Sequence, residues 1–364
     1  MLWENTATLA NGTCSRLASK LTEIDVDIKT YNELCDKLNT STFKSKFVHD
    51  VFRTKAGKLV MTSKSRLDVH VNNQVVTFRK KETIFIGNSN VYEFESKNLA
   101  TTLIVKEMEW NEFSTEEEVL SSIRNACSSL VPGRVVEEPI GKYYYIVMQK
   151  AAGDLVVLKE VIEKSITSKE KYTKLVFEII ESVRKSLICL WEKENKFYAD
   201  LKLENVLFTC EKNQRIGIII GDVGSLGDDW LLTTYPAPEY TRPSYTPKKL
   251  FSKSLAWFLG QMFLKFCKDD FSPDLKKSHL PPSVLKTATS GDPYFWTHTA
   301  APRSNREITL HRKTIFSPVF IDKLENHFQT SYGKIGLSSY FYPNPNKRPS
   351  VYKKIVDDGI YKFP

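Results

Sequence analysis

The chain has 364 residues, of which 41% are hydrophobic, 26% charged and 12% aromatic. This composition excludes a disordered tail, a collagen-like repeat and a disulfide miniprotein, and the length suits about two domains or one two-lobed domain with an extension. The formal net charge is +9, with 52 Lys and Arg against 43 Asp and Glu. Because no run of five or more basic residues occurs, the excess indicates a solvated basic face, and we do not expect nucleic acid as a partner.

The six cysteines stand far apart, at positions 14, 35, 127, 189, 210 and 267, and none forms a CxxC pair. Their spacing signals neither a zinc site nor a disulfide framework, and it suits a reducing compartment. The N-terminus lacks a basic start followed by an apolar core, and no aliphatic run approaches the ~20 residues that span a bilayer. We therefore expect a cytoplasmic protein with no membrane partner.

The first elements in chain order are helical and then mostly extended. Apolar residues from Cys14 to Leu38 recur at helical spacing and predict one or two amphipathic helices. A helix is also expected at Ser114–Cys127. Short β-branched segments predict strands. They lie at Lys58–Met61, Leu67–Val71, Val75–Arg79, Thr83–Ile86, Val91–Phe94, Thr101–Lys106 and Tyr143–Met148.

Beyond Gly153 the pattern becomes mainly helical. Apolar spacing from Leu175 to Trp191 predicts a long helix. Two short strands follow at Val206–Thr209 and Ile216–Ile220. Residues 268–315 are rich in Pro, Ser and Thr without periodicity, which is typical of a surface insertion.

One segment carries the chemistry of the chain. It reads YADLKLENVLF from Tyr198, and GDVGS follows it from Gly221 after a strand. Phosphoryl transfer to a hydroxyl needs a carboxylate that orients the hydroxyl, a lysine that neutralises the moving group, and oxygen ligands for magnesium. We therefore predict that Asp200 and Lys202 are catalytic and that Asn205 and Asp222 bind Mg²⁺.

These motifs resemble the eukaryotic protein kinase family, whose catalytic loop reads HRDLKxxN and whose metal motif reads DFG. YPAPE, which ends at Glu239, and NPNKRPS, which contains Arg348, resemble two later motifs of the same family. The resemblance spans residues 82–358. Within the family, YADLKLEN and GDVGS resemble the divergent serine/threonine kinases of large DNA viruses, which implies the host cytoplasm or the virion as location. The resemblance also implies a buried ion pair between Glu239 and Arg348.

The same resemblance implies an ATP phosphate site built around Lys106. This lysine ends a predicted strand and would bind the α- and β-phosphates, with Glu116 of the next helix as its partner. Glu117 and Glu118 remain alternatives for that partner, because three glutamates at a helix start also suit the helix dipole.

The remaining nucleotide contacts implied by the resemblance lie on the phosphate-binding loop and on the segment after the strand that ends at Met148. Gly87 aligns with the first glycine of the loop, whereas Ser89 and Tyr92 stand where the family has its other glycines. The backbone of Gln149 and Ala151 would face the adenine.

Some positions depart from the family pattern. Tyr198 and Ala199 replace the His and Arg before the catalytic Asp, so we do not expect switching by loop phosphorylation. Leu255 replaces the Asp that braces the catalytic loop from below, so another part of the chain must supply a brace.

The resemblance implies an α+β, bilobal protein-kinase-like fold. It divides the chain into an extension at 1–80, helical and then extended, a strand-rich N-lobe at 81–150 and a helical C-lobe at 151–364. ATP and Mg²⁺ are the expected cofactors, and serine or threonine hydroxyls of a protein are the expected substrate. Two alternatives are a pseudokinase that acts as a binding or virion scaffold, and a small-molecule phosphotransferase.

Overall fold

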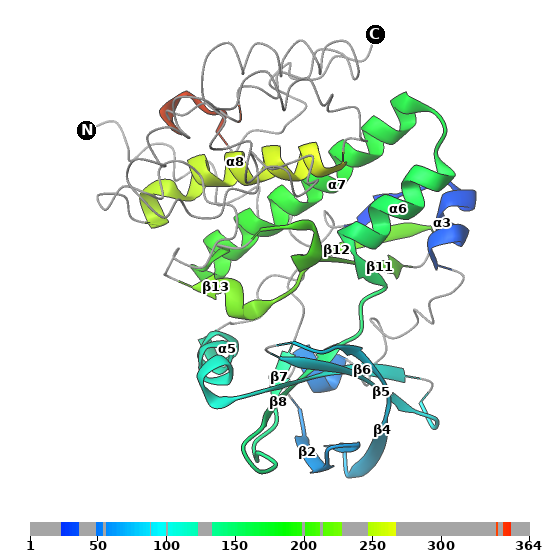
Figure 1. Cartoon of the computed structure of the whole chain (residues 1–364), viewed down its shortest axis with the longest axis vertical. Coiled ribbons are helices and arrows are strands. Elements are labelled where there is room, and N and C mark those ends of the chain that lie inside the picture. The colour runs from blue at the N-terminus through cyan, green and yellow to red at the C-terminus, as the bar shows by residue number, and fades with distance from the viewer. Residues whose placement is uncertain are drawn as a thin grey trace, which may run out of the picture. The chain divides into compact units, whose positions relative to one another are not determined.

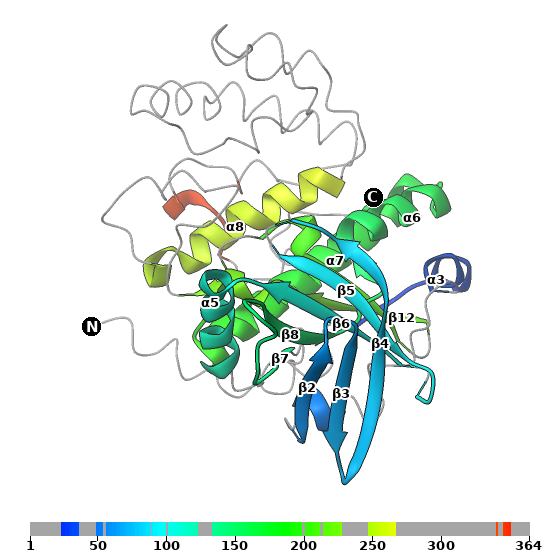
Figure 2. The ribbon, with the colours of Figure 1, turned by 60° about the horizontal axis from the view of Figure 1, so that its bottom comes forward.

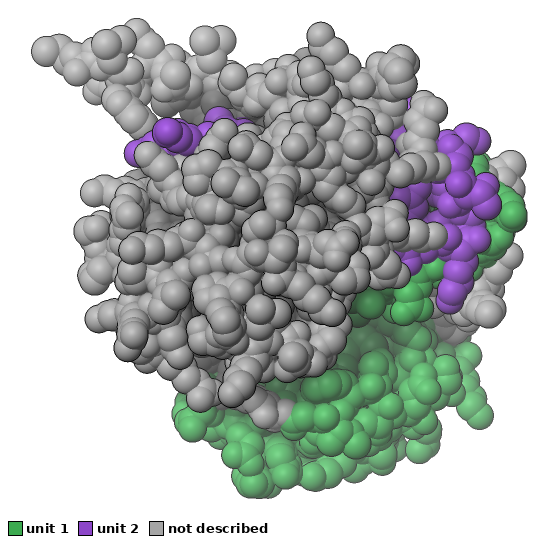
Figure 3. All heavy atoms as spheres, turned by 45° about the horizontal axis from the view of Figure 1, so that its top comes forward, with its two compact units in different colours: residues 1–161, 189–196, 204–227 green, residues 162–188, 197–203, 228–364 purple. Residues whose placement is uncertain are grey.

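The computed structural model describes residues 23–35, 49–53, 56–87, 89–99, 101–122, 133–198, 201–211, 214–227, 247–266, 340 and 345–350. Helices and strands are mixed, so the predicted α+β class is confirmed (Figure 1). The chain divides into two compact units, coloured in Figure 3. Unit 1 comprises residues 1–161, 189–196 and 204–227, and unit 2 comprises residues 162–188, 197–203 and 228–364. The predicted insertion at 268–315 lies outside the described residues.

A seven-stranded antiparallel sheet dominates unit 1, in the order β2-β3-β4-β5-β6-β8-β7 (Figure 2). Its strands are β2 (Lys58–Ser63), β3 (Arg66–Val71), β4 (Gln74–Phe85), β5 (Asn90–Ser96), β6 (Thr101–Met108), β7 (Gly133–Val135) and β8 (Tyr144–Gln149). Alternate residues of these strands face one common apolar core. This core includes Leu67, Phe78, Phe94, Leu103, Val105, Tyr145 and Val147, together with Phe52 from the turn η1 (His49–Arg53).

The long strand β4 replaces two shorter strands that the sequence predicts. Val75–Arg79 and Thr83–Ile86 are parts of one strand, which pairs with β5 through register shifts between Lys80 and Glu82 and between Thr83 and Phe85. Bulges bend a strand without ending it. The boundary expected at residue 81 therefore falls inside β4, and residues 58–80 belong to the same sheet as the strands that follow.

A single arginine connects the two edges of this sheet. Arg134 of β7 donates hydrogen bonds to the carbonyl oxygens of Ala56 and Gly57, both at 2.8 Å, and of Val51, at 3.3 Å. These carbonyls lie just before β2, the opposite edge strand. Gly57 has φ of +76°, and a Cβ there would meet the carbonyl oxygen of His70 at 1.8 Å, so only glycine fits this approach.

A second sheet of unit 1 has the order β1-β12-β11-β9. Its strands are β1 (Glu23–Asp25), β12 (Arg215–Ile220), β11 (Val206–Glu211) and β9 (Gly153–Asp154). Ile24, which the helical spacing placed in a helix, lies in β1, because this segment pairs with β12 across 190 positions of sequence. The helix α3 (Ile28–Cys35) follows it.

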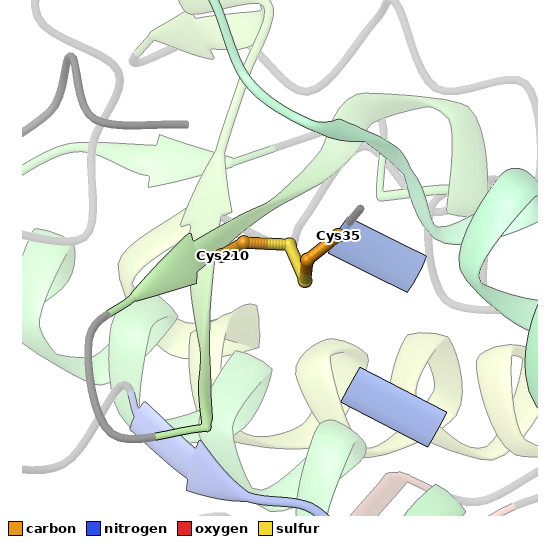
Figure 4. The surroundings of a disulfide bond; sticks show 2 residues. All are labelled: Cys35 and Cys210. Carbon is orange, nitrogen blue, oxygen red and sulfur yellow. A yellow bond between two sulfur atoms is a disulfide. The ribbon is translucent and has the colours of Figure 1, made fainter. Parts of the chain in front are cut away.

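A disulfide joins Cys35 of α3 to Cys210 of β11, 175 positions apart (Figure 4). Cys189 is also disulfide-bonded. The expectation that the cysteines form no disulfide framework was therefore wrong. Cysteine spacing reveals only local pairs, whereas this bond depends on how a distant helix packs against a strand.

The later part of the chain is mainly helical. Its helices are α6 (Leu155–Ser165), α7 (Lys169–Cys189) and α8 (Pro247–Phe266), with a π-helical turn η2 (Leu190–Glu194), a 3₁₀ turn η7 (Pro345–Lys347) and the two-residue strands β10 (Phe197–Tyr198) and β13 (Leu226–Gly227). Within unit 2, the Tyr172 hydroxyl of α7 donates to the Phe266 carbonyl oxygen of α8. No helix in the described ranges is long and apolar enough to cross a membrane.

Candidate active site

Lys106 lies on β6, an inner strand of the seven-stranded sheet. It is opposite Val91 of β5 and Ile146 of β8 in the strand register. Leu103 and Val105 point into the apolar core, so alternation along the strand places Lys106 on the other face. Its side chain is only 16% exposed. A lysine held in this way needs an anionic partner.

Glu116 of α5 (Trp110–Ser122) supplies that partner. The Lys106 ammonium donates to Oε1 of Glu116, which is itself buried. The helix starts four residues earlier than the predicted Ser114, and its residues Phe113 and Val119 are also buried. Since Glu116 lies three positions from each, it faces inward with them. Glu118, one of the alternative partners, is exposed. The structure thus pairs Lys106 with Glu116, the partner expected from the sequence.

Asp222 brings a third segment of the chain to the same place. It follows β12, and its Oδ1 lies 3.7 Å from Nζ of Lys106. Its backbone has φ of 49° and ψ of 71°, a left-handed conformation that is uncommon for a residue with a side chain. Strained backbone of this kind clusters at functional sites. Three charged residues from β6, α5 and the end of β12 therefore meet.

Gly224 allows α5 to approach the segment after Asp222. It lies in the 3₁₀ turn η4 (Val223–Ser225), and a Cβ there would lie 2.8 Å from Cγ and 3.1 Å from Oε1 of Glu116. Any larger residue would displace the Glu116 side chain. The second glycine of the GDVGS motif, Gly224, is thus explained by its packing against the carboxylate that pairs with Lys106.

Asn205 and Asp222 leave the same end of the β11–β12 hairpin. Val206 is opposite Ile220 in the register, and the Gly221 amide donates to the Asn205 carbonyl oxygen at 2.9 Å. Asn205 ends the 3₁₀ turn η3 (Leu203–Asn205) and is buried, whereas the Asp222 side chain is 37% exposed.

One amide and one carboxylate fit the preference of Mg²⁺, which binds few protein oxygens and completes its octahedron with water and substrate phosphates. Among the described residues, no group of three or more His, Cys, Asp or Glu is arranged to hold a metal ion. A site of this kind would therefore depend on the oxygens of a nucleotide as well as on Asn205 and Asp222.

The predicted phosphate-binding loop connects β4 to β5. Gly87 lies in it, and a Cβ there would meet the Phe85 ring at 2.5 Å. Tyr92, which the alignment placed in the loop, instead lies within β5, and its hydroxyl donates to Oε1 of Glu107 at 3.0 Å. The loop is thus shorter than the resemblance to the kinase motif implies, because β5 already begins at Asn90.

Gln149 and Ala151 lie at and just after the end of β8. The Gln149 side chain is buried and opposite Leu103, on the core side of the sheet. Its Nε2 has no hydrogen-bond partner within the described ranges. The next amide, of Ala152, donates to the Phe208 carbonyl oxygen of β11 at 2.8 Å. The Gln149 side chain thus faces the core, and the backbone contacts with adenine that the resemblance implies for Gln149 and Ala151 stay a prediction.

Two buried carboxylates of the same sheet, Glu107 and Glu93, were not predicted from the sequence. Glu107 accepts hydrogen bonds from Asn90 at 3.1 Å and from the Tyr92 and Tyr145 hydroxyls, both at 3.0 Å. Burial raises the pKa of the Glu107 carboxyl, but these donors outweigh it, so the pKa lies below its ordinary value. The signal in the sequence was a glutamate at a position where the alternation of β6 requires an inward-facing residue.

Glu93 of β5 is the second. It is opposite Ile104 on the Lys106 face of the sheet, and it forms ion pairs with Lys81 at 2.9 Å and Lys150 at 2.5 Å. Burial raises the pKa of Glu93, and the two ammonium groups lower it by more, so the carboxyl stays ionised. Lys150 stands between Gln149 and Ala151 in sequence, so this cluster adjoins the predicted base-contacting backbone.

The remaining predicted residues belong to other parts of the chain. Lys202 directly precedes η3. Asp200 and Glu239 lie outside the described residues. Arg348 is buried, and its guanidinium carbon lies 5.0 Å from the centre of the Trp257 ring of α8, within unit 2. The ion pair between Arg348 and Glu239 stays a prediction.

Comparison of the sequence with models of known protein families and with curated proteins finds no match for this chain.

Proposed function

We propose that the chain is a protein kinase that transfers the γ-phosphate of ATP to serine or threonine hydroxyls of a protein. The observation that carries the proposal is the meeting of Lys106, Glu116 and Asp222. Asp222 comes from a segment more than 100 positions after the other two. A partly buried lysine shared by two carboxylates is held in one geometry, which suits a group that must bind phosphate oxygens.

Each residue has a distinct task in this reaction. Lys106, oriented by Glu116, binds the α- and β-phosphates, and Asn205 and Asp222 hold the Mg²⁺ that neutralises the triphosphate. Lys202 stabilises the charge of the moving phosphoryl group. Asp200 orients the acceptor hydroxyl, an interaction that matters in the transition state more than in nucleotide binding.

The bilobal kinase-like fold is part of the same proposal. It is supported by the chain order of the elements, in which the seven-stranded antiparallel sheet with α5 comes before the helices α6, α7 and α8.

A thermal-shift assay and a radiolabelled phosphate-transfer assay test the proposal. Millimolar MgATP should raise the melting temperature, because a ligand that binds only the folded state stabilises it. Glu116→Gln should abolish most of the shift and of the transfer to generic protein acceptors. Glu118→Gln is the matched control, since Glu118 is exposed on the same helix, and it should behave as the wild type.

A scaffold protein that keeps the same fold without transfer chemistry is the second candidate. It is favoured by the end of β4 and the residue after it, where the side chains of Ile84, Phe85 and Ile86 are 51%, 58% and 78% exposed. Exposed apolar side chains are available to contact a partner protein. If the wild type shows no thermal shift and no transfer with MgATP, while it still binds a protein through this region, the scaffold function holds and the kinase proposal is wrong.

A further inference from the structure

The N-terminal segment Glu23–Cys35 is fastened to the hairpin that carries Asn205 and Asp222. β1 pairs with β12 at three register positions, from Glu23 opposite Gly217 to Asp25 opposite Arg215. Arg215 Nε donates to Oδ1 of Asp25 at 2.9 Å. At the end of the segment, the disulfide from Cys35 to Cys210 attaches α3 to β11 (Figure 4). Both strands of the hairpin are thus held from the same segment.

This segment has a defined structure of its own. Asp27 caps α3: its Oδ1 accepts from the Thr30 amide at 3.1 Å and its Oδ2 from the Thr30 hydroxyl at 2.9 Å. The hydrogen bond from the Thr30 backbone amide keeps the pKa of the Asp27 carboxyl below its ordinary value. Ile24, Thr30 and Cys35 are buried. The segment therefore packs as a folded element rather than as a tail.

The β11–β12 hairpin has one edge that the strand β1 of this segment covers. β12 is buried along Ile216, Ile218 and Ile220, and β1 pairs with the edge that β11 leaves free. A three-residue strand is marginal when it pairs alone, and an uncovered strand edge is unsatisfied. The disulfide attaches α3, which follows β1, to the neighbouring strand β11. Cys35 and Cys210 are 7% and 5% exposed, so the bond is shielded and acts as a permanent fastening.

We propose that Glu23–Cys35 is a covalently fastened brace that holds the turn end of the β11–β12 hairpin, and that the hairpin thereby keeps Asn205 and Asp222 in position at its open end. Cys35 and Cys210 are positioning residues in this arrangement. The proposal rests on the proposed function only for its consequence, the binding of Mg²⁺.

The test uses the full chain with the substitutions Cys35→Ala and Cys210→Val together, which remove the bond and keep the site apolar. Cys189→Ala is the matched control, because it removes another disulfide-bonded cysteine. A second variant, Cys35→Ser, guards against a folding defect of the pair. The first readout is amide hydrogen exchange in residues 206–209 and 218–222. The second is binding of Mn²⁺ with a non-hydrolysable ATP analogue, followed by electron paramagnetic resonance.

The brace predicts faster exchange in both strands at the open end of the hairpin in the bond-free variants, and unchanged exchange there in Cys189→Ala. It also predicts Mn²⁺ binding weakened on the order of 10-fold, with excess metal restoring occupancy. Unchanged exchange in folded bond-free variants would overturn the brace. If the wild type itself binds no Mn²⁺ with the analogue, the kinase proposal fails, and hydrogen exchange still decides whether the segment is a brace.

Discussion

At the scale of single residues, the neighbouring residues Lys106 and Glu107 of β6 point to opposite faces of the sheet. Lys106 points to Glu116 and Asp222, whereas Glu107 points toward the core and accepts hydrogen bonds from Asn90, Tyr92 and Tyr145. These donors tie β5, β6 and β8 together at the level of Lys106. A buried charge retained at such a position has to be fully hydrogen-bonded, because a lost partner leaves it unsatisfied.

We predict that Glu107→Gln lowers the free energy of unfolding by about 1–3 kcal/mol at pH 7, because the amide offers one acceptor to donors that share two oxygens. The folded-state pKa of Glu107 lies below its ordinary value of 4.5. The carboxylate therefore stabilises the fold above pH 4.5, and this contribution is lost as pH falls through the depressed pKa. Urea unfolding at pH 7 and at about pH 3 should show a gap between variant and wild type that narrows with acid. Glu109→Gln, in an exposed ion pair with Lys142, is the control and should change little.

We predict that Gly224→Ala weakens the binding of an ATP analogue, because its Cβ would force the Glu116 side chain away from Lys106. Glu116 is a flexible side chain, so stability should fall less than affinity. A double-mutant cycle with Glu116→Ala checks this mechanism: the coupling should be about 0.5–3 kcal/mol. Additive effects on analogue binding would mean that Gly224 acts in another way.

At the scale of elements, the edges of the seven-stranded sheet are joined by the side chain of Arg134. Its planar fork reaches three carbonyl oxygens that precede β2. Burial lowers the pKa of the Arg134 guanidinium, yet arginine stays charged at any ordinary pH. Only arginine offers enough donors in this geometry.

We predict that Arg134→Lys lowers the free energy of unfolding by about 1–3 kcal/mol, since at least one buried carbonyl loses its donor. Denaturant unfolding measures this change. Arg79→Lys is the control, because Arg79 is exposed on β4 of the same sheet. Equal stability of the two variants would show that Arg134 does not join the edges.

Most elements of unit 1 could be predicted from periodicity. The strands around Leu67–Val71, Val91–Phe94 and Thr101–Lys106 are where β-branched alternation indicates. The helix near Ser114 is also present, although it begins at Trp110. The ends and continuity of β4 and the strand at Ile24 were missed, because pairing with distant strands decides both.

At the scale of the whole molecule, the Cys35–Cys210 bond closes a loop of 175 positions. A long loop restricts the unfolded chain strongly, so we predict that Cys35→Ala with Cys210→Val lowers the free energy of unfolding by about 2–5 kcal/mol. Unfolding with and without a dithiol reductant checks this value, and the variant should respond less to reductant than the wild type. If loss of the bond leaves stability unchanged, the bond does not constrain the unfolded chain.

The sequence by itself determined the residue types of the candidate site and the α+β class. YADLKLEN and GDVGS supply a lysine, an amide and two carboxylates in the order that phosphoryl transfer needs, and the helical segment after Lys106 supplies three candidate partners, Glu116, Glu117 and Glu118. Short-range patterns are sufficient for such inferences, because helix and strand periods are local properties.

Only the tertiary structure decided which carboxylate meets Lys106, why Gly224 is a glycine, and where the N-terminal segment packs. It also decided that Tyr92 lies in a strand and that Cys35 bonds Cys210. Each depends on contacts between segments far apart in sequence. Such contacts are set by the packing of a whole core and by strand register, which no local pattern of residues specifies.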